Sequence, residues 1–463
     1  MDTTSHLLNP LKAPGWLQQL QWVGDPVGYM EAAARQHPDL FTAKVVGFGG
    51  TLVFLNDPRA IQELLTNDRK TFLALGCSNQ ILSPLLGDYS IIMLDGDQHK
   101  RRRQLLMPPF HGERMRAFGQ LICQLTNAAF DQLPLNRPFS ARTVMQEISL
   151  QIILQVVFGL TEGDRCHQLK DLLASLLDLF RSPLSSSFLF FPVLQKDLGA
   201  WSPWGKFIRE QRQIDALIYD EIAERRTKDD RDRIDILSML MAARDEAGQP
   251  MTDQELRDEL MTLLFAGHET TATAMSWALY WVHHLPAVRE KLLQELATLG
   301  QKPDPMDVFR LPYLTAICNE TLRIYPVAML VFPRIVQTPV TLLNHPLPPK
   351  TAVVGCIYLL HHREDLYPNP KQFRPERFLE RQFTPYEFMA FGGGARRCIG
   401  EALAMFEMKL VLATILSRYQ LALANNQPEY PRRRGVTLAP AHGVKMVLTG
   451  ARSQQVVPLV EAT

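Results

Sequence analysis

A single cysteine stands in a glycine-rich segment near the end of the chain. Residues 391–400 read FGGGARRCIG, and a strong helical pattern follows directly after Cys398. Glycines let the backbone turn tightly and approach a flat ligand. The free amides and the positive dipole end of the following helix favour a thiolate and lower the pKa of a thiol. Cys398 is therefore a candidate anionic ligand, although a lone cysteine is more often a small buried hydrophobic residue.

A second candidate site lies in the middle of the longest helix that the sequence predicts. This helix begins at Thr252, where Glu255 completes a capping box, and runs without proline to His284. Its centre is apolar except for residues 267–271, which read GHETT. A glycine inside a helix costs about 1 kcal/mol relative to alanine, and a buried glutamate costs more unless it is paired or protonated. These costs indicate a functional segment, in which we expect His268 only to pack or to make a local hydrogen bond.

Together these segments resemble the cytochrome P450 family. The family's cysteine-ligand pattern, F-x-x-G-x-R-x-C-x-G, is met at Phe391, Gly394, Arg396, Cys398 and Gly400. Residues 266–271, AGHETT, are similar to its oxygen-activating pattern, and Glu320 with Arg323 is similar to its E-x-x-R pair. Viewed alone, that pair would be a surface ion pair of little energetic value. Arg377 in FRPERF matches the family's third partner, which implies a structural triad that locks a long irregular segment.

The resemblance covers nearly the whole chain and implies its architecture. We expect a mainly α protein with the cytochrome P450 fold, a single large helical domain over residues 1–463 with small peripheral β-sheets. Strand patterns at 42–55, 340–356 and 436–448 fit these sheets, and a helix pattern starts near Ile236. Only a short stretch follows the cysteine loop, so we expect no fused reductase.

The resemblance also implies a haem b cofactor whose iron is bound by Cys398. Thr270 would relay protons during oxygen activation, and Glu269 would feed that relay from solvent. Ala266, Glu269 and Thr270 share one helix face by their spacing, and this face would lie against the haem. Gly267 would remove bulk beside the ring.

Cations are needed for the haem propionates. The segment GDQHKRRRQLLMPPF matches the family's helix at the haem edge and places His99 and Arg103 four residues apart on one face. Many relatives have tryptophan where His99 stands. Arg334 and Arg396 match two further positions that hold propionates, a task that suits the forked guanidinium group. Phe391 opens the cysteine loop, and we expect it to contact the haem.

Four further cations are candidates for binding an electron donor: Lys100, Arg101, Arg102 and Arg397. In the family, this side of the molecule receives the donor, which implies a ferredoxin or a flavodoxin-like protein steered by charge. The same four residues are equally well explained as an ordinary solvated surface.

The substrate class follows from the residues that would line the pocket. All of them are apolar: Leu75, Ile91, Ile92, Phe265, Val327, Ala328, Met329, Leu330 and Ala441. Residues 188–204, rich in aromatic side chains, stand where the family has its entrance lid. We therefore expect a hydrophobic small molecule, a fatty acid or a terpenoid, as overall resemblance to cyanobacterial members also implies.

Composition excludes several other classes. Lys and Arg total 49 against 48 Asp and Glu, so no global field would draw the chain to nucleic acid or an anionic membrane. Six scattered cysteines without a CxxC pair argue against a disulfide scaffold and structural zinc. No stretch near the N-terminus approaches the roughly 20 apolar residues of a membrane span. We expect a cytoplasmic protein.

Two alternatives to an O2-dependent monooxygenase stay open. A haem-thiolate peroxygenase or isomerase would need no external electrons, but such relatives usually disrupt the acid–alcohol pair that is intact here as Glu269 and Thr270. A haem-based sensor or a carrier of hydrophobic molecules is the third class, and it has no use for a buried proton relay.

Overall fold

The computed structural model describes most of the chain. The described residues are 8–46, 50–110, 114–179, 194–199, 202–227, 233–300, 302–435 and 437–452. Helices dominate and the sheets are small and separate, which confirms the predicted fold class. A helix does begin at Ile236, as its pattern indicates.

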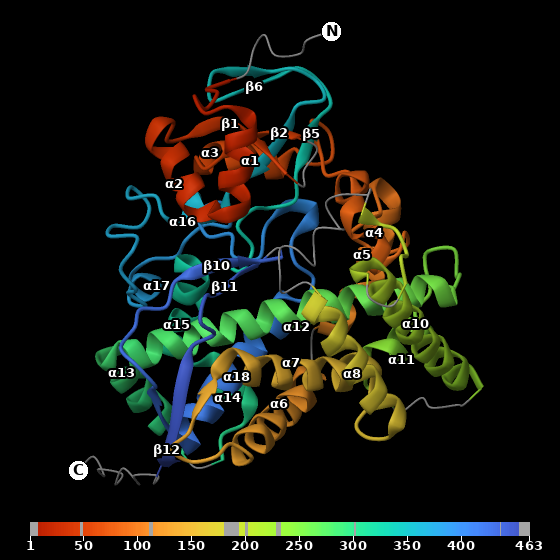
Figure 1. Cartoon of the computed structure of the whole chain (residues 1–463), viewed down its shortest axis with the longest axis vertical. Helices are drawn as coiled ribbons and strands as arrows, with labels where there is room; N and C mark the ends of the chain where they lie inside the picture. The colour runs from red at the N-terminus through yellow and green to blue at the C-terminus, as the bar shows by residue number, and fades with distance from the viewer. Residues whose placement is uncertain are drawn as a thin grey trace.

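Helices build the larger part of the molecule (Figure 1). In chain order they are α1 (Gly15–Gly24), α2 (Pro26–Gln36), α3 (Pro58–Thr66), α4 (Ser83–Leu86), α5 (Gly96–Leu106), α6 (Arg114–Asp131), α7 (Ala141–Phe158), α8 (Asp164–Leu179), α10 (Pro203–Thr227), α11 (Ile236–Ala242), α12 (Asp253–His284), α13 (Pro286–Ala297), α14 (Pro305–Arg310), α15 (Pro312–Ile324), α16 (Ile357–His361), α17 (Arg377–Glu380) and α18 (Glu401–Arg418).

Within the described residues, the strands form four small sheets. The largest has the order β1 (Leu40–Val45), β2 (Gly50–Leu55), β8 (Ala352–Gly355), β5 (Arg334–Val336) and β3 (Phe72–Leu73). The others are β10 (Pro431–Arg434) with β11 (Thr437–Pro440), β6 (Val340–Leu342) with β7 (His345–Leu347), and β4 (Pro138–Ser140), β12 (Lys445–Ala451) and β9 (Tyr419–Leu423) in the order β4-β12-β9. The predicted strands at 42–55 and 340–356 are confirmed, and β11 and β12 occupy the third region.

Two apolar cores lie on either side of the cysteine loop. The larger is built by the helical layer around α7, α12 and α18, and the smaller lies between the largest sheet and α1 to α3 (Figure 1). Met389 belongs to the smaller core, whereas Phe391 and Ile399 pack against the larger one. The loop that carries Cys398 is therefore held at the boundary between the two cores.

Helix α12 crosses the middle of the molecule and confirms the predicted long helix (Figure 1). Its capping box is present, since Thr252 and Glu255 exchange side-chain to backbone hydrogen bonds. Most of its residues are buried, so packing on both flanks stabilises a helix that carries polar residues at its centre.

The predicted triad is fully buried and confirmed. Arg323 donates two hydrogen bonds to Glu320, at 2.7 and 2.9 Å, and Arg377 donates to the same carboxylate at 3.0 Å. All three residues are at most 2% exposed. The two arginines also donate to the carbonyl of Gln372, at 3.4 and 3.2 Å, so the triad holds the irregular segment that leads to the cysteine loop.

No helix in the described part of the chain combines the length and the apolar character that crossing a membrane requires.

Candidate haem-thiolate site

The cysteine loop is closed by its own backbone. The amide of Cys398 donates to the carbonyl of Phe391 at 3.0 Å. Gly392 and Gly394 adopt φ values of +69° and +65°, which residues with a side chain rarely adopt. Gly400 is the N-cap residue of α18, so the helix begins three residues after the cysteine, as the sequence indicates.

The surroundings of the Cys398 sulfur act in opposite directions on its pKa. Burial raises the pKa of the thiol, whereas the Gly400 amide and the charges of Arg103 and Arg397 lower it. The amide at the helix start lowers this pKa, as the sequence predicts, but burial is the larger cause and makes the net direction upward. The cysteine nevertheless keeps an exposed surface, and a cation bound at that surface would favour the thiolate.

Four arginines come together around His99, three of them predicted from the sequence. Burial is the first cause that lowers the pKa of His99 to about 3. The next causes are the positive charges of Arg396, Arg103, Arg69 and Arg334. The fold therefore concentrates cations at one place, as two propionates would require. Arg69 was missed, because nothing in its local sequence distinguishes it.

Arg334 is buried at the edge of the cysteine loop. It is 0% exposed, and it donates to the carbonyls of Phe332 at 2.5 Å and Gly393 at 3.3 Å. Asp68, which the sequence analysis missed, lies 3.5 Å away and accepts from the Ala395 amide at 2.6 Å. The Nε of Arg334 is buried and has no partner within the described residues.

Arg396 is hydrogen-bonded to three backbone carbonyls, and its expected contact with a propionate stays a prediction. Its guanidinium donates to the backbone carbonyls of Ile91 at 2.9 Å, Ala74 at 2.7 Å and Leu94 at 2.6 Å. Arg396 thereby fastens residues 74–94 to the cysteine loop. Arg103 similarly donates to the carbonyl of Arg397 at 2.6 Å, which ties α5 to the same loop.

The central segment of α12 has an exposed residue, Ala266, and a half-buried one, Thr270, one turn later. The hydroxyl of Thr270 donates to the carbonyl of Ala266, one turn earlier, at 2.5 Å. Ala266 is exposed although it lies mid-way along a mostly buried helix. A threonine that bonds its own helix in this way loosens the regular backbone pairing and can exchange that bond for another.

Glu269 is turned towards α7, and it is paired. Arg142 forms an ion pair with it, and Gln146 donates to its other oxygen at 2.7 Å. The ring of His268 donates to the carbonyl of the same Gln146 at 2.9 Å, so this histidine makes a local hydrogen bond, as expected. Arg142 and Gln146 were missed, although a charged residue and an amide one turn apart in a largely apolar helix were a visible signal.

Gly267 packs closely against the neighbouring helix α7. A Cβ on Gly267 would lie 2.7 Å from the terminal methyl of Ile153 on α7. The missing side chain therefore lets α12 and α7 cross closely, and the role expected for Gly267 beside the haem stays a prediction.

Arg102 is not part of a surface patch, and that prediction is wrong. It is 6% exposed and forms ion pairs with Glu255 at 2.5 Å and Glu259 at 2.8 Å, both on α12. Burial raises the pKa of Glu259 to about 8, and Arg102 opposes that shift. The helical turn of α5 simply directs this residue inwards. Lys100, Arg101 and Arg397 are exposed, and Arg397 pairs with Glu401 at 2.7 Å.

The expected pocket-lining segment around Ala328 is held by backbone pairing. Ala328 bridges Thr437, Leu330 bridges Cys356, and the amide of Leu438 donates to the carbonyl of Val327 at 2.9 Å. Ala328 is exposed and Leu330 half-buried, so apolar surface is available there. Of the predicted lid at 188–204, residues 188–193, 200 and 201 lie outside the described residues.

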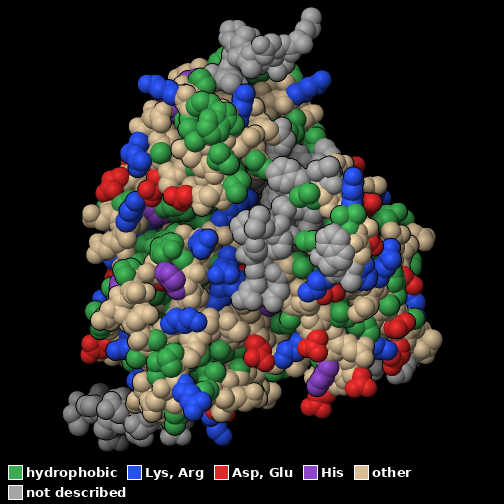
Figure 2. Space-filling view, in the orientation of Figure 1, with side chains coloured by type: hydrophobic (Ala, Val, Ile, Leu, Met, Phe, Trp, Pro, Cys, Tyr) green, Lys and Arg blue, Asp and Glu red, His purple; other side chains and the backbone are tan. Residues whose placement is uncertain are grey.

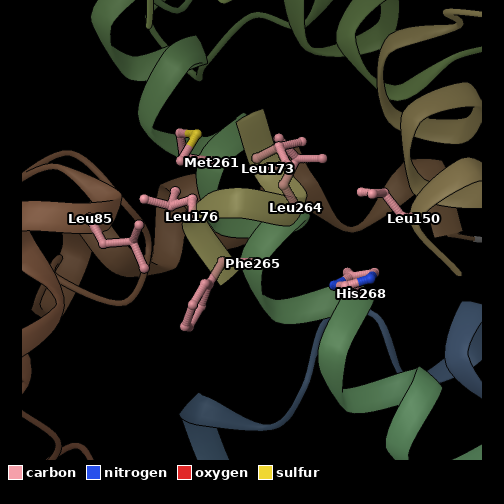
Figure 3. A pocket seen from close by; sticks show the side chains of 8 residues that line it. All are labelled: Leu85, Leu150, Leu173, Leu176, Met261, Leu264, Phe265 and His268. Atoms are coloured by element: carbon pink, nitrogen blue, oxygen red, sulfur yellow. The ribbon is translucent and has the colours of Figure 1, made fainter. Parts of the chain in front are cut away.

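A small cavity lies between α4, α7, α8 and α12, and Figure 3 shows its lining. Its volume is about 10 Å³, the size of one water molecule. Six lining residues are Leu or Met, and Phe265, which belongs to the expected substrate pocket, points away from His268 (Figure 3). This cavity is too small for the expected substrate.

The residues of the cysteine loop and its surroundings fit a haem. The donor set offers one accessible sulfur, next to cations that its charge would attract. The Nε of Arg334 is a buried donor without a partner in the described structure, and it lies in the same cationic group as His99. A group with one iron and two carboxylates satisfies both features.

Comparisons with known proteins agree with this geometry. The family model described as Cytochrome P450 matches residues 8–446. The chain is 36% identical to cytochrome P450 135B1 of Mycobacterium tuberculosis over 95% of this chain and 90% of that protein. It is 32% identical to cytochrome P450 135A1 of the same species, over 95% of each.

Two solved structures share the fold. The retinoic acid-bound cyanobacterial CYP120A1 superposes with a TM-score of 0.83 at 23% identity, over 96% of this chain and 99% of that one. The haem domain of cytochrome P450DA gives 0.84 at 22% identity, over 97% and 100%. With its cysteine loop, buried triad and central polar helix segment in place, the chain belongs to the cytochrome P450 family of haem-dependent monooxygenases.

Proposed function

We propose that this monooxygenase inserts one oxygen atom of O2 into an apolar molecule that carries a carboxylate, a fatty acid or a terpenoid acid. The observation that carries the proposal is the group of cations around His99 beside the loop that presents the accessible sulfur of Cys398. When bound, haem b supplies the oxygen activation; the chain holds haem and substrate, and delivers protons.

Cys398 is proposed as the iron ligand, with its sulfur favoured as a thiolate by the Gly400 amide and by Arg103. Arg334 and His99 are proposed to meet the propionates, supported by the field of Arg103 and Arg396. Phe391 closes the loop through its carbonyl and packs at the boundary of the larger core.

Thr270 and Glu269 are proposed to move protons. The Thr270 hydroxyl lies one turn from the exposed Ala266 and can replace its bond to the Ala266 carbonyl by a bond to a reacting group. Glu269 lies one residue away, is 19% exposed and is oriented by Arg142 and Gln146. Ala266 keeps the helix surface beside the hydroxyl small.

Electrons are proposed to come from a separate ferredoxin or flavodoxin-like protein. Lys100 and Arg101 on α5 and Arg397 in the cysteine loop support a docking surface, since all three are exposed and α5 contacts that loop through Arg103. A reducing, cytoplasmic setting is proposed as well, since the cysteines described as free include Cys123 and Cys166, both partly exposed.

Charge near the apolar lining favours an acid over a neutral substrate. Figure 2 shows Lys and Arg side chains gathered near the middle of this face, over β10. That strand contributes Arg432, Arg433 and Arg434, and its partner β11 pairs with Ala328 of the expected lining. The retinoic acid of the cyanobacterial neighbour is a molecule of the proposed class.

The first test is a spectral titration of the purified protein. Long-chain fatty acids and terpenoid acids should shift the haem spectrum at lower concentration than their methyl esters. If the methyl esters bind as tightly as the acids, the proposal that the substrate carries a carboxylate is wrong. The Cys398→Ser variant should lose the carbon monoxide band typical of thiolate ligation, and an unchanged band would reject Cys398 as ligand.

A second test separates the oxygenase from its alternatives. Thr270→Ala should consume reductant without matching product and release hydrogen peroxide, because proton delivery is no longer coupled to the substrate. Full turnover with peroxide alone, without turnover with a redox chain, would favour the peroxygenase. A variant that behaves as wild type in every assay would favour the sensor or carrier.

A further inference from the structure

His361 connects the buried triad to the cysteine loop. It is the last residue of α16 and is 0% exposed. Its backbone carbonyl accepts a hydrogen bond from Arg323 at 2.8 Å. Its ring Nε2 accepts one from the amide of Met389 at 2.9 Å, two residues before Phe391. One residue therefore touches both the rigid triad and the start of the loop that presents Cys398.

The direction of the second bond determines the form of the ring. A backbone amide can only donate, so Nε2 of His361 must carry a lone pair and the proton must sit on Nδ1. That Nδ1 is buried and has no partner within the described residues. Burial and the charge of Arg323 lower the pKa of His361 well below its ordinary value, which keeps the ring neutral. The chain thus accepts a buried donor without an acceptor in order to hold the Met389 amide.

The segment before the loop is held from a second side. The ring of His361 stacks on Phe388, with centroids 5.2 Å apart. The hydroxyl of Tyr367 donates to the carbonyl of Glu387 at 2.8 Å, and the guanidinium of Arg323 lies over the Tyr367 ring at 5.2 Å. Residues 387–389 are therefore fastened through two side chains, and Arg323 contacts both residues.

We propose that His361 is a positioning residue that links the cysteine loop to the rigid Glu320–Arg323–Arg377 triad. Through this link it fixes the position of the Cys398 sulfur. This role rests on the proposed ligation of haem by Cys398. Without the ring acceptor, the Met389 amide is left buried without a partner, and the loop gains freedom to move away from its position.

Three variants separate the hydrogen bond from simple packing. His361→Phe keeps a ring that can stack on Phe388 but removes the acceptor. His361→Gln restores an acceptor oxygen near the position of Nε2. His362→Phe is the matched control. The ring of the adjacent His362 makes a hydrogen bond with the carbonyl of Tyr358 at 2.8 Å and stacks on the ring of Tyr358, and neither contact involves the cysteine loop.

Two measurements on the haem-loaded protein report the loop. In His361→Phe, hydrogen exchange of the peptide covering residues 385–400 should be about tenfold faster, as expected when one buried hydrogen bond is lost. The ratio of thiolate-free to thiolate-bound carbon monoxide complex should rise by about the same factor. His361→Gln should restore both values substantially, and His362→Phe should match wild type.

The proposal fails if His361→Phe leaves exchange and spectrum unchanged, or if His362→Phe perturbs them equally, since the effect would then be general packing. Should wild-type protein lack the thiolate band, the proposed function fails instead. The exchange of residues 385–400 still tests the hydrogen bond in that case, because it does not depend on the ligand of the iron. A ¹⁵N spectrum with the ring proton on Nε2 would also overturn the proposal.

Discussion

The carboxylate of Glu269 on α12 is paired with the guanidinium of Arg142 on α7, across the crossing of the two helices. Arg142 is 5% exposed and Glu269 19%, so the pair is shielded from water on the side of the arginine and open on the side of the acid. Gln146 completes the arrangement by donating to the second carboxylate oxygen. The proposed proton donor is therefore oriented by a neighbouring helix and keeps a path to solvent.

Replacing Arg142 should impair proton delivery more than substrate binding. In Arg142→Gln we expect kcat to fall about tenfold while KM stays within about twofold, because the acid loses its orientation but the apolar lining is untouched. In Arg142→Lys, kcat should fall less, because lysine keeps the positive charge beside Glu269. Steady-state turnover with product analysis measures both. An equal rise in KM would show that Arg142 supports the substrate pocket instead.

Adding a methyl group at Gly267 should force apart α12 and α7. Gly267→Ala should lower the free energy of unfolding by about 1–2 kcal/mol, as the clash with Ile153 outweighs the gain in helix propensity. Ile153→Val removes the clashing methyl, so the double variant should be more stable than the two single effects predict. Denaturant unfolding of all four proteins measures the coupling. Additive effects would place the strain elsewhere.

Removing Arg102 should destabilise the protein, whereas removing its neighbour Lys100 should not. Arg102→Leu leaves the buried Glu259 and the partly exposed Glu255 without their shared cation, which should cost about 3–5 kcal/mol of unfolding free energy. Lys100→Ala should change it by less than about 0.5 kcal/mol but weaken the binding of an acidic electron donor, most strongly at low salt. A stable Arg102→Leu protein with weakened donor binding would restore the surface interpretation.

A buried glutamate on α18 should make stability depend on pH. Burial raises the pKa of Glu407 to about 8, with the Ser149 hydroxyl acting against it. Between its ordinary pKa of 4.5 and about 8, the native state holds a proton that the unfolded state releases. Stability should therefore fall as pH rises through this range, by up to about 1.4 kcal/mol per pH unit.

Glu407→Gln isolates this contribution. The variant should lose that part of the slope, and Glu401→Gln, at a half-buried position of the same helix, should keep it, as measured by denaturant unfolding at several pH values. A slope that Glu407→Gln leaves intact would assign the pH dependence to another group.

Features encoded within a few residues could be predicted from the sequence. The capping box at Thr252, the spacing of Glu320 and Arg323, and the glycines before Cys398 each depend on neighbours at most one or two turns away. Such patterns specify helix ends, helix faces and turns directly. The family resemblance then ordered them into one fold, and the chain-wide family match bears that out.

The tertiary structure alone decided which side chains meet across the molecule. Arg142 and Glu269 lie 127 positions apart, and Arg103 and Arg397 lie 294 apart. Charge and spacing made Arg102 look like its exposed neighbours, yet the packing of α5 on α12 turns it inwards. The contact of His361 with Met389 is a second example, because nothing in the sequence around His361 indicates that its buried ring accepts a hydrogen bond from the Met389 amide. Contacts of this kind depend on how whole elements pack, and local sequence does not encode that geometry.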